Sequence, residues 1–158
     1  MTGSATIDFA VERQWLESLL RTTIPMAAHM ELTIGRLDED GIRLDFPLPP
    51  SVNDKGTAFG GALASAMILA GWSLPRLLLR RGGIPAELVI GRCELRYVRP
   101  VSGPYVAECA WPDQPVQQDF LTDTDALGKG RLDLSVRVLA DNEVAASLQA
   151  RYAALITR

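Results

Sequence analysis

Apolar residues recur every three to four positions in two segments, and this spacing predicts two helices. The stripe of the first comprises Val11, Trp15, Leu16, Leu19 and Leu20. Proline cannot continue a helix, so we expect this one to stop before Pro25. In the second, which begins near Ala58, apolar residues occupy most of the circumference, which predicts burial on nearly every side. We expect Pro75 to kink or restart it near Ser73, and Gly82-Gly83 to end it.

Alternation of apolar and polar residues predicts about six strands elsewhere. The apolar members of the alternations are Met30, Leu32 and Ile34; Ile42, Leu44, Phe46 and Leu48; Val89, Gly91, Cys93, Leu95 and Tyr97; Tyr105, Ala107, Cys109 and Trp111; Leu132, Leu134, Val136 and Val138; and Val144, Ala146, Leu148, Ala150 and Tyr152. Each set is expected to form one face of an antiparallel sheet. Asp40-Gly41 and Asp141-Asn142 are expected hairpin turns, and residues 117–127 form either a short helix or a lid-like loop. The pattern predicts an α+β fold in which one long helix packs against this sheet.

Length and charge limit what such a fold can do. With 158 residues and 47% hydrophobic composition, the chain fits one domain, residues 1–158, with one substantial core. A net charge of −3 argues against nucleic acid as a partner. Glycine, serine, proline and arginine interrupt the most apolar stretch, Ala58 to Leu79, so we expect no membrane span. Residues 1–6 precede Asp8, Glu12 and Glu17 and lack the order of a secretory signal. We therefore expect a soluble, cytoplasmic protein.

Cysteine and histidine are too sparse for metal chemistry. Cys93 and Cys109 lie apart in strand-like runs, which predicts buried free thiols rather than a disulfide or a metal site. His29, the only histidine, falls on the polar side of its predicted strand beside Glu31. A solvated or sheet-edge histidine is the simplest interpretation, because no second histidine exists to build a metal site. We therefore expect no metal and no cofactor.

The segment most informative about chemistry is a glycine-punctuated polar loop, residues 53–61, that runs directly into the second helix. The first amides of a helix have no partner inside it, and Gly60 and Gly61 carry no side chain that would keep a ligand away. A carbonyl oxygen or an oxyanion can dock at such a helix start.

Several segments together resemble a known family. They are Ile24-Pro25, the loop 53–61, Leu69-Ala70-Gly71-Trp72 and Leu95-Arg96-Tyr97-Val98-Arg99-Pro100. They are similar to the putative thioesterase family first defined as the C-terminal domain of YiiD-type acetyltransferases, within the hotdog-fold superfamily, and the resemblance covers nearly the whole chain. It implies a sheet wrapped around the central helix, a homodimer as the minimum unit, and a tunnel for an acyl thioester at the dimer interface. Acyl-CoA or acyl-carrier-protein thioesters are the implied substrates, and pairing of dimers into tetramers is left open.

The spacing Asn53-x-x-Gly56-x-x-Phe59-Gly60-Gly61 is similar to the Asn-x-x-Gly-x-x-His-Gly-Gly signature of phenylacetyl-CoA-type hotdog thioesterases. Phe59 replaces the histidine, and Ile68 falls where that group carries an acid on the helix. Neither side chain can take up a proton, so the mechanism of that group does not transfer whole. The resemblance leaves Asn53 to orient the water or the carbonyl, the Gly60 and Gly61 amides as the oxyanion site, and Asp54 as general base.

Each of these residues also has a structural interpretation. Asn53 and Asp54 fit an Asx-turn that caps the helix equally well. Thr57 is suited to be the N-cap residue itself. The two glycines also permit close packing against the sheet. Ser65 either lines the tunnel or packs as a small residue, and Trp72 and Tyr97 are expected anchors in the core or at an interface.

Substrate binding is assigned by charge and apolarity. Phe59, Leu63 and Met67 are expected to line the acyl tunnel, and Thr57 is a further candidate for substrate binding. The candidates for the phosphates of coenzyme A are Lys55, Arg80, Arg81, Arg99, Lys129 and Arg131.

Three functions follow. Thioester hydrolysis is the one we favour, and a non-hydrolytic acyl-CoA binding module is the alternative that the missing histidine and acid leave open. A hotdog hydratase or dehydratase fits less well, because it needs an acid–histidine pair and only His29 is available.

Overall fold

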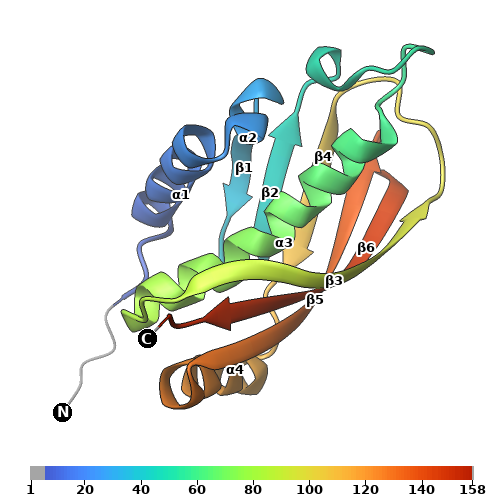
Figure 1. The fold of residues 1–158 in the computed structure, drawn as a ribbon. Coiled ribbons are helices and arrows are strands. Elements are labelled where there is room, and N and C mark those ends of the chain that lie inside the picture. The colour runs from blue at the N-terminus through green and yellow to red at the C-terminus, as the bar shows by residue number, and fades with distance from the viewer. Residues whose placement is uncertain (1–5, 158) are drawn as a thin grey trace.

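One antiparallel sheet curves around one long helix, α3, in the computed structural model, which describes residues 6–157 (Figure 1). The strands lie in the order β1-β2-β4-β5-β6-β3. They are β1 (Thr33–Leu37), β2 (Gly41–Phe46), β3 (Glu87–Tyr97), β4 (Tyr105–Ala110), β5 (Lys129–Ala140) and β6 (Glu143–Leu155). The helices are α1 (Phe9–Thr23), α2 (Pro25–His29), the short 3-10 turn η1 (Pro49–Ser51), α3 (Gly60–Gly82) and α4 (Gln114–Leu127). The predicted α+β architecture is confirmed.

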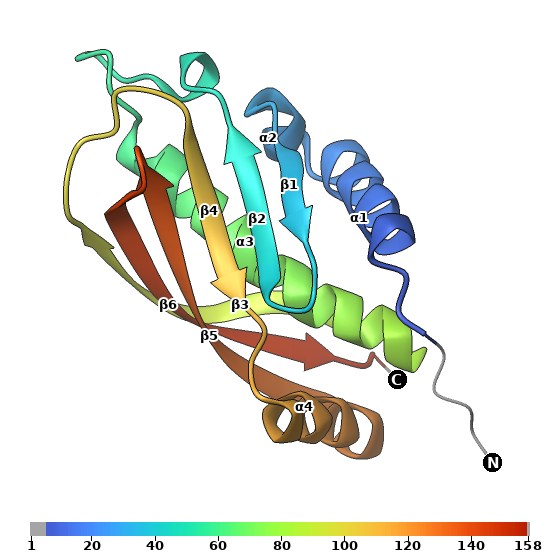
Figure 2. The ribbon, with the colours of Figure 1, turned by 180° about the vertical axis from the view of Figure 1, so that it is seen from behind.

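The core lies between α3 and the concave face of the sheet. Figure 2 shows the sheet from behind, with α3 on its far side. Apolar residues alternate along β5 and β6, so one face of each strand meets α3 while the other carries charged and polar side chains. α3 is long and apolar enough to cross a membrane, contrary to our expectation, but 67% of its most apolar window is buried inside the fold. Its hydrophobicity is therefore accounted for by its central position.

α3 ends as predicted but is not restarted at Pro75. Gly83 adopts a left-handed conformation (φ 63°), and its amide donates to the carbonyl of Arg80, which is a glycine C-cap. Pro75 lies inside one continuous helix. Leu74, Pro75 and Leu77 are buried, and this packing offsets the hydrogen bond that proline cannot make. Of the two alternatives predicted for Pro75, the restart near Ser73 is therefore wrong, and the kink stays a prediction.

Two local predictions need correction, and one open alternative is resolved. Residues 25–29 form α2 and the first predicted strand begins only at Thr33, so His29 ends a helix and is exposed. Pro25 explains this, because proline is favoured at the first helical position. An irregularity in the β3–β6 pairing at Gly91 reverses the alternation. Cys93 lies on the α3 side of the sheet but is exposed, because it belongs to the uncovered edge strand, whereas Cys109 is buried as predicted. The ambiguous segment 117–127 belongs to α4.

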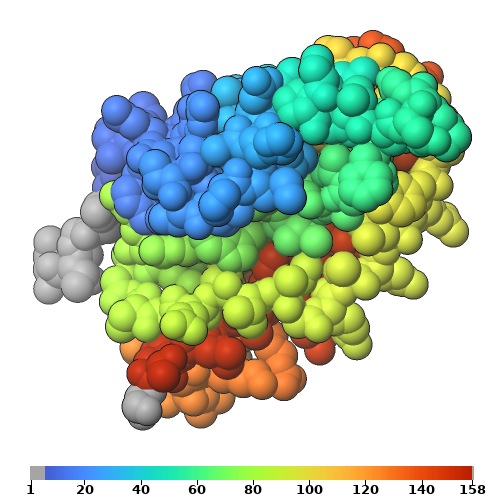
Figure 3. Space-filling view, turned by 45° about the horizontal axis from the view of Figure 1, so that its top comes forward, coloured from blue at the N-terminus to red at the C-terminus, as the bar shows by residue number. Residues whose placement is uncertain are grey.

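The two edges of the sheet differ in whether another element of the chain covers them. At the β1 edge, the Glu17 carboxylate of α1 accepts a hydrogen bond from the Ile34 amide (2.8 Å), so α1 occupies this edge. At the β3 edge, every residue from Gly91 to Tyr97 is exposed, on both faces of the strand. A long edge with unpaired backbone groups is a site for pairing with another strand. Figure 3 shows that part of the α3 surface is also visible between α1–α2 and β3.

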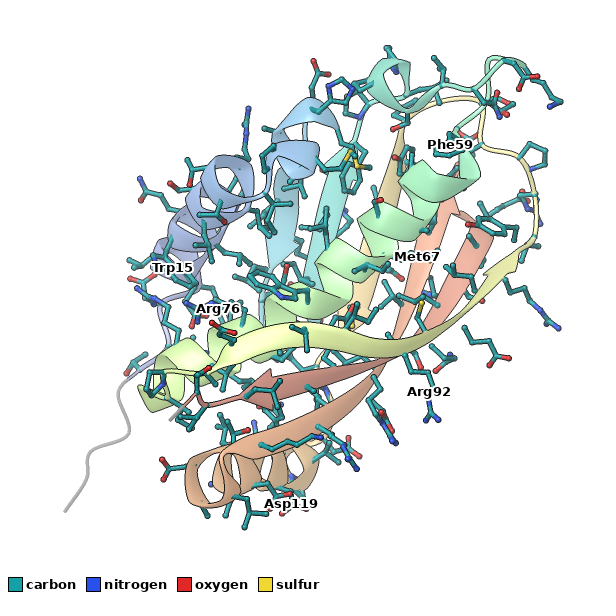
Figure 4. The ribbon with its side chains drawn as sticks, viewed as in Figure 1. Trp15, Phe59, Met67, Arg76, Arg92 and Asp119 are labelled. Carbon is teal, nitrogen blue, oxygen red and sulfur yellow. The ribbon has the colours of Figure 1, made fainter. Side chains whose placement is uncertain are left out.

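α1 is held on the C-terminal half of α3 by aromatic and charged contacts. The guanidinium groups of Arg76 and Arg80 lie 5.0 and 4.5 Å from the centre of the Trp15 ring, and Figure 4 labels Trp15 and Arg76. Glu12 forms a two-fold ion pair with Arg81, with N···O distances of 2.7 and 2.8 Å. This pair is largely buried, since the Glu12 side chain is only 5% exposed.

Candidate functional site at the start of the central helix

Asn53 organises the loop that precedes α3. Its side-chain oxygen accepts hydrogen bonds from the amides of Lys55 (2.9 Å) and Thr57 (3.1 Å), and its side-chain nitrogen donates to the Thr57 hydroxyl (2.9 Å). Gly56 adopts a left-handed conformation with φ 77°, which glycine allows without strain. The Asn53 side chain therefore closes an Asx-turn, as predicted. It does not cap α3, and the predicted Thr57 N-cap is wrong, because the N-cap residue is Phe59 and no side chain of the described residues caps the helix.

Asp54 and Lys55 form the tip of this loop. Their side chains are 81% and 76% exposed and pair with each other at 3.3 Å. Neither lines the pocket described below. In the single chain the Asp54 carboxylate therefore faces solvent, away from the amides that it was expected to serve.

The start of α3 is fixed by two neighbouring segments, and its first amides are left open. The Ala58 amide donates to the carbonyl of Val101 (2.8 Å), and the Phe59 amide donates to the carbonyl of Ser51 (2.6 Å). Ser51 is held in turn by a buried hydroxyl contact with Tyr105 (2.9 Å). Within residues 6–157, no hydrogen bond reaches the amides of Gly60 and Gly61. The structure thus presents two adjacent free donors at the positive end of a buried helix dipole.

The two glycines differ in what they permit. A Cβ at Gly61 would lie 2.4 Å from the ring of Phe59, so glycine is needed there for the ring to keep its place. A Cβ at Gly60 would lie 3.5 Å from Tyr97, which is an ordinary contact. Phe59 itself is 59% exposed at the helix start (Figure 4). Its ring lies at the mouth of the site, in the place of the histidine of the related signature.

A pocket of about 340 Å³ opens beside the helix start. It is lined by Thr57, Ala58, Gly60, Leu63, Tyr97, Val98, Arg99 and Pro100. Three of these lining residues were predicted as site residues: Thr57, Gly60 and Leu63. Three other predicted site residues are close to them along the chain but do not line the pocket: Phe59, Gly61 and Ser65. The Ser65 hydroxyl donates to the Gly61 carbonyl (2.8 Å), as a packed helix serine does. Apart from Ala58, the rest of the pocket wall comes from the end of the segment Leu95–Pro100, which is part of the family resemblance. Tyr97 in this segment was expected only to anchor the core or an interface.

Tyr97 reaches from the open β3 edge to the helix start. Its hydroxyl donates to the Gly60 carbonyl (2.8 Å), and its ring lies against Gly60. Tyr97 and Val98 are each 52% exposed. With Phe59 they form an apolar rim around the two free amides.

The charges near the pocket are largely paired. Arg99 forms an ion pair with Glu143, and Lys55 pairs with Asp54. Arg81, expected to contact the substrate, lies at the other end of α3, roughly 30 Å from Gly60 at the helical rise per residue. Its guanidinium is engaged with Glu12 and lies 4.6 Å from the centre of the Trp111 ring. Arg81 is therefore a structural residue within its own chain and is removed from the candidate site.

No carboxylate or imidazole from the described part of the chain lines the pocket. Its lining contains no aspartate, glutamate or histidine among the described residues, and His29 is not part of it. Burial raises the pKa of the Cys109 thiol to about 12, so this thiol is not a ready nucleophile. Within residues 6–157, no group of three His, Cys, Asp or Glu side chains is arranged to hold a metal ion. What the site offers is two amide donors, an apolar rim and a polar loop.

Comparison with known proteins identifies a family that matches this chain. The model of a family described as "Putative thioesterase (yiiD_Cterm)" matches residues 13–156. The structure is similar to that of a protein of unknown function from Chlorobaculum tepidum TLS, with 28% sequence identity, coverage of 93% of this chain and 95% of that chain, and a TM-score of 0.88.

Two further solved structures share the fold. A putative thioesterase from Shewanella oneidensis has 22% identity, coverage of 93% and 99%, and a TM-score of 0.83. A Pseudomonas aeruginosa protein described as a probable thioesterase has 21% identity, coverage of 97% and 99%, and a TM-score of 0.76. The family match covers almost the whole described chain, from α1 to the end of β6. The chain therefore belongs to the YiiD C-terminal type of putative thioesterases and has their hotdog fold.

Proposed function

We propose that this protein hydrolyses acyl-CoA or acyl-carrier-protein thioesters at the start of α3. The observation that carries the proposal is the pair of free amides at Gly60 and Gly61. Attack on a thioester carbonyl moves negative charge onto its oxygen, and fixed amide donors at a helix start stabilise that charge. The apolar rim of Phe59, Tyr97 and Val98 suits the acyl group beside it.

The acyl chain is proposed to enter along Leu63, which lines the pocket. Met67, one turn further along α3, is fully buried and closes this direction in the single chain. Methionine adapts its shape readily, so Met67 can form the end of an apolar tunnel. Lys55 and Arg99 would have to exchange their acidic partners for phosphate groups to hold coenzyme A.

The assembly is proposed to be a homodimer formed through β3. The strand is open along its edge, and Cys93, Leu95 and Tyr97 pair with residues of β6 that are buried or turn towards the core. Their side chains thus lie on the α3 side of the sheet but remain exposed. A second copy related by a two-fold axis would pair its own β3 here and cover these side chains. Asp54 would serve as a base only where a second subunit encloses it.

Leu95→Lys is expected to produce monomers at micromolar concentration, because a charge would be placed on the apolar side of the proposed strand pairing. Sedimentation velocity should give twice the mass of one chain for the wild type and the mass of one chain for the variant. Thr33→Lys is the matched control, because Thr33 is exposed on the opposite edge, which α1 occupies. A Leu95→Lys protein that stays dimeric would rule out this interface.

A non-hydrolytic acyl-CoA binding module is the second candidate. The observation in its favour is the lack of a carboxylate or imidazole in the pocket lining among the described residues. Thiol release from acyl-CoAs of different chain length, measured alongside calorimetric binding, separates the two functions. We expect turnover with at least one acyl-CoA. Tight binding without thiol release would establish the binding module instead.

A further inference from the structure

Tyr97 contacts one of the two peptide groups whose amides the proposed reaction uses. Its hydroxyl donates to the Gly60 carbonyl at 2.8 Å, while the ring contacts Gly60 and forms part of the pocket wall. The carbonyl of Gly60 and the amide of Gly61 belong to the same planar peptide unit. A hydrogen bond to the Gly60 carbonyl therefore changes the strength of the Gly61 amide as a donor.

We propose that Tyr97 is a positioning residue that strengthens the Gly61 amide as a donor to the thioester oxygen; this rests on the proposed function. A carbonyl oxygen has two lone pairs, so Gly60 can accept from Tyr97 in addition to its helical partner. Each additional hydrogen bond to the carbonyl polarises the peptide unit and makes its N–H a better donor. The hydroxyl thereby acts on the charge that develops in the transition state, without touching the substrate.

The position of Tyr97 in the chain separates this role from simple packing. It is the last residue of β3, on the open edge, and it is 52% exposed. In the single chain, an exposed hydrogen bond of this kind contributes little to folding, because water competes for both groups. If Tyr97 had a purely structural role, removing its hydroxyl would therefore lower the stability slightly and leave kcat unchanged. In the proposed dimer the partner's β3 would cover Tyr97, so sedimentation velocity must show that Tyr97→Phe keeps the wild-type assembly.

Tyr152 provides a matched control. Its hydroxyl also donates to a carbonyl of α3, that of Ile68, at the same distance of 2.8 Å. Ile68 lies two helical turns beyond Gly60, and its carbonyl is not in the peptide group of either free amide. Tyr97→Phe and Tyr152→Phe thus each remove a tyrosine hydroxyl that donates to a carbonyl of α3, at different distances from the site.

We expect Tyr97→Phe to lower kcat by about three- to tenfold with KM within about twofold of wild type, as a weakened donor in the transition state requires. Tyr152→Phe should leave kcat unchanged, even if its melting temperature falls. A Tyr97→Phe protein with wild-type kcat would overturn the inference, as would an equal loss of kcat in Tyr152→Phe.

A second measurement is independent of turnover. In a two-dimensional amide NMR spectrum, Tyr97→Phe should move the Gly61 amide proton to lower chemical shift, because its peptide carbonyl loses a hydrogen bond, and Tyr152→Phe should not. If the wild type hydrolyses no thioester, the proposed function fails, while this spectrum still tests the Tyr97 contact. An unchanged Gly61 resonance in Tyr97→Phe would contradict the inference whatever the activity.

Discussion

Gly60→Pro is expected to lower kcat/KM for an acyl-CoA substrate by about 100-fold, the loss typical of removing one oxyanion donor. Gly60 is the first residue of α3, a position where proline is favoured and where only its N–H is lost. Phe59 before it has φ −61° and ψ 137°, the extended conformation that a residue preceding proline adopts. The substitution therefore removes a proposed donor while the helix is retained. Steady-state thiol release and circular dichroism measure the two effects separately.

Gly60→Ala is the matched control, since it keeps the amide and its Cβ would make an ordinary contact with Tyr97 at 3.5 Å. We expect its kcat/KM to stay within about threefold of wild type, because no transition-state donor is lost. Wild-type activity in Gly60→Pro would show that the Gly60 amide does not bind the developing charge. A loss of the same size in both variants would point instead to crowding of the pocket.

Glu12→Ala is expected to lower the free energy of unfolding by about 3 kcal/mol, because it leaves the Arg81 guanidinium without its partner in a mostly buried place. The side chains of Glu12 and Arg81 are 5% and 22% exposed, and they fasten α1 to the C-terminal end of α3. Chemical denaturation followed by fluorescence of the tryptophans should show the loss. Thioester hydrolysis per folded molecule should be unchanged, since the pair lies far from Gly60.

Asp133→Ala serves as control for this prediction. Asp133 also forms a two-fold ion pair, with Arg151 at 2.7 and 3.0 Å, but its side chain is 64% exposed. Arg151 lowers the pKa of the Asp133 carboxyl, yet water screens the pair, and we expect a loss below about 1 kcal/mol. Equal losses in Glu12→Ala and Asp133→Ala would show that burial does not set the strength of the Glu12–Arg81 pair.

The fold was predictable where one physical signal dominated. Alternation identified β2, β5 and β6, and the Asp141-Asn142 turn was found because both residues tolerate the positive φ that they adopt, 53° and 61°. The signal failed where a second effect competed with it. The helix that begins at Pro25 extends to His29, and Glu31 adopts a positive φ of 58°. The alternation from His29 to Ile34 therefore becomes a strand only at Thr33. The irregularity at Gly91 exchanges the two faces of β3. The spacing of apolar residues alone predicts neither of these departures.

The position of the site was predictable, but the roles of its residues were not. Glycines between a polar loop and an apolar helix indicate open amides whatever the tertiary structure, and the structure leaves those of Gly60 and Gly61 free among the described residues. The roles of Asn53, Asp54 and Arg81 depend on hydrogen bonds and ion pairs that only the fold brings together. Tyr97 is separated from Gly60 by 37 positions, so no local pattern could link them.

The central claim is that the thioester carbonyl binds at the amides of Gly60 and Gly61. A crystal structure with a non-hydrolysable acyl-CoA analogue that keeps the carbonyl group tests it most directly. We predict the carbonyl oxygen at about 3 Å from the nitrogen of Gly60 or Gly61, a hydrogen-bond distance, with the acyl chain against Leu63. An analogue bound with its carbonyl more than about 4 Å from both nitrogens, beyond hydrogen-bond range, would contradict the account.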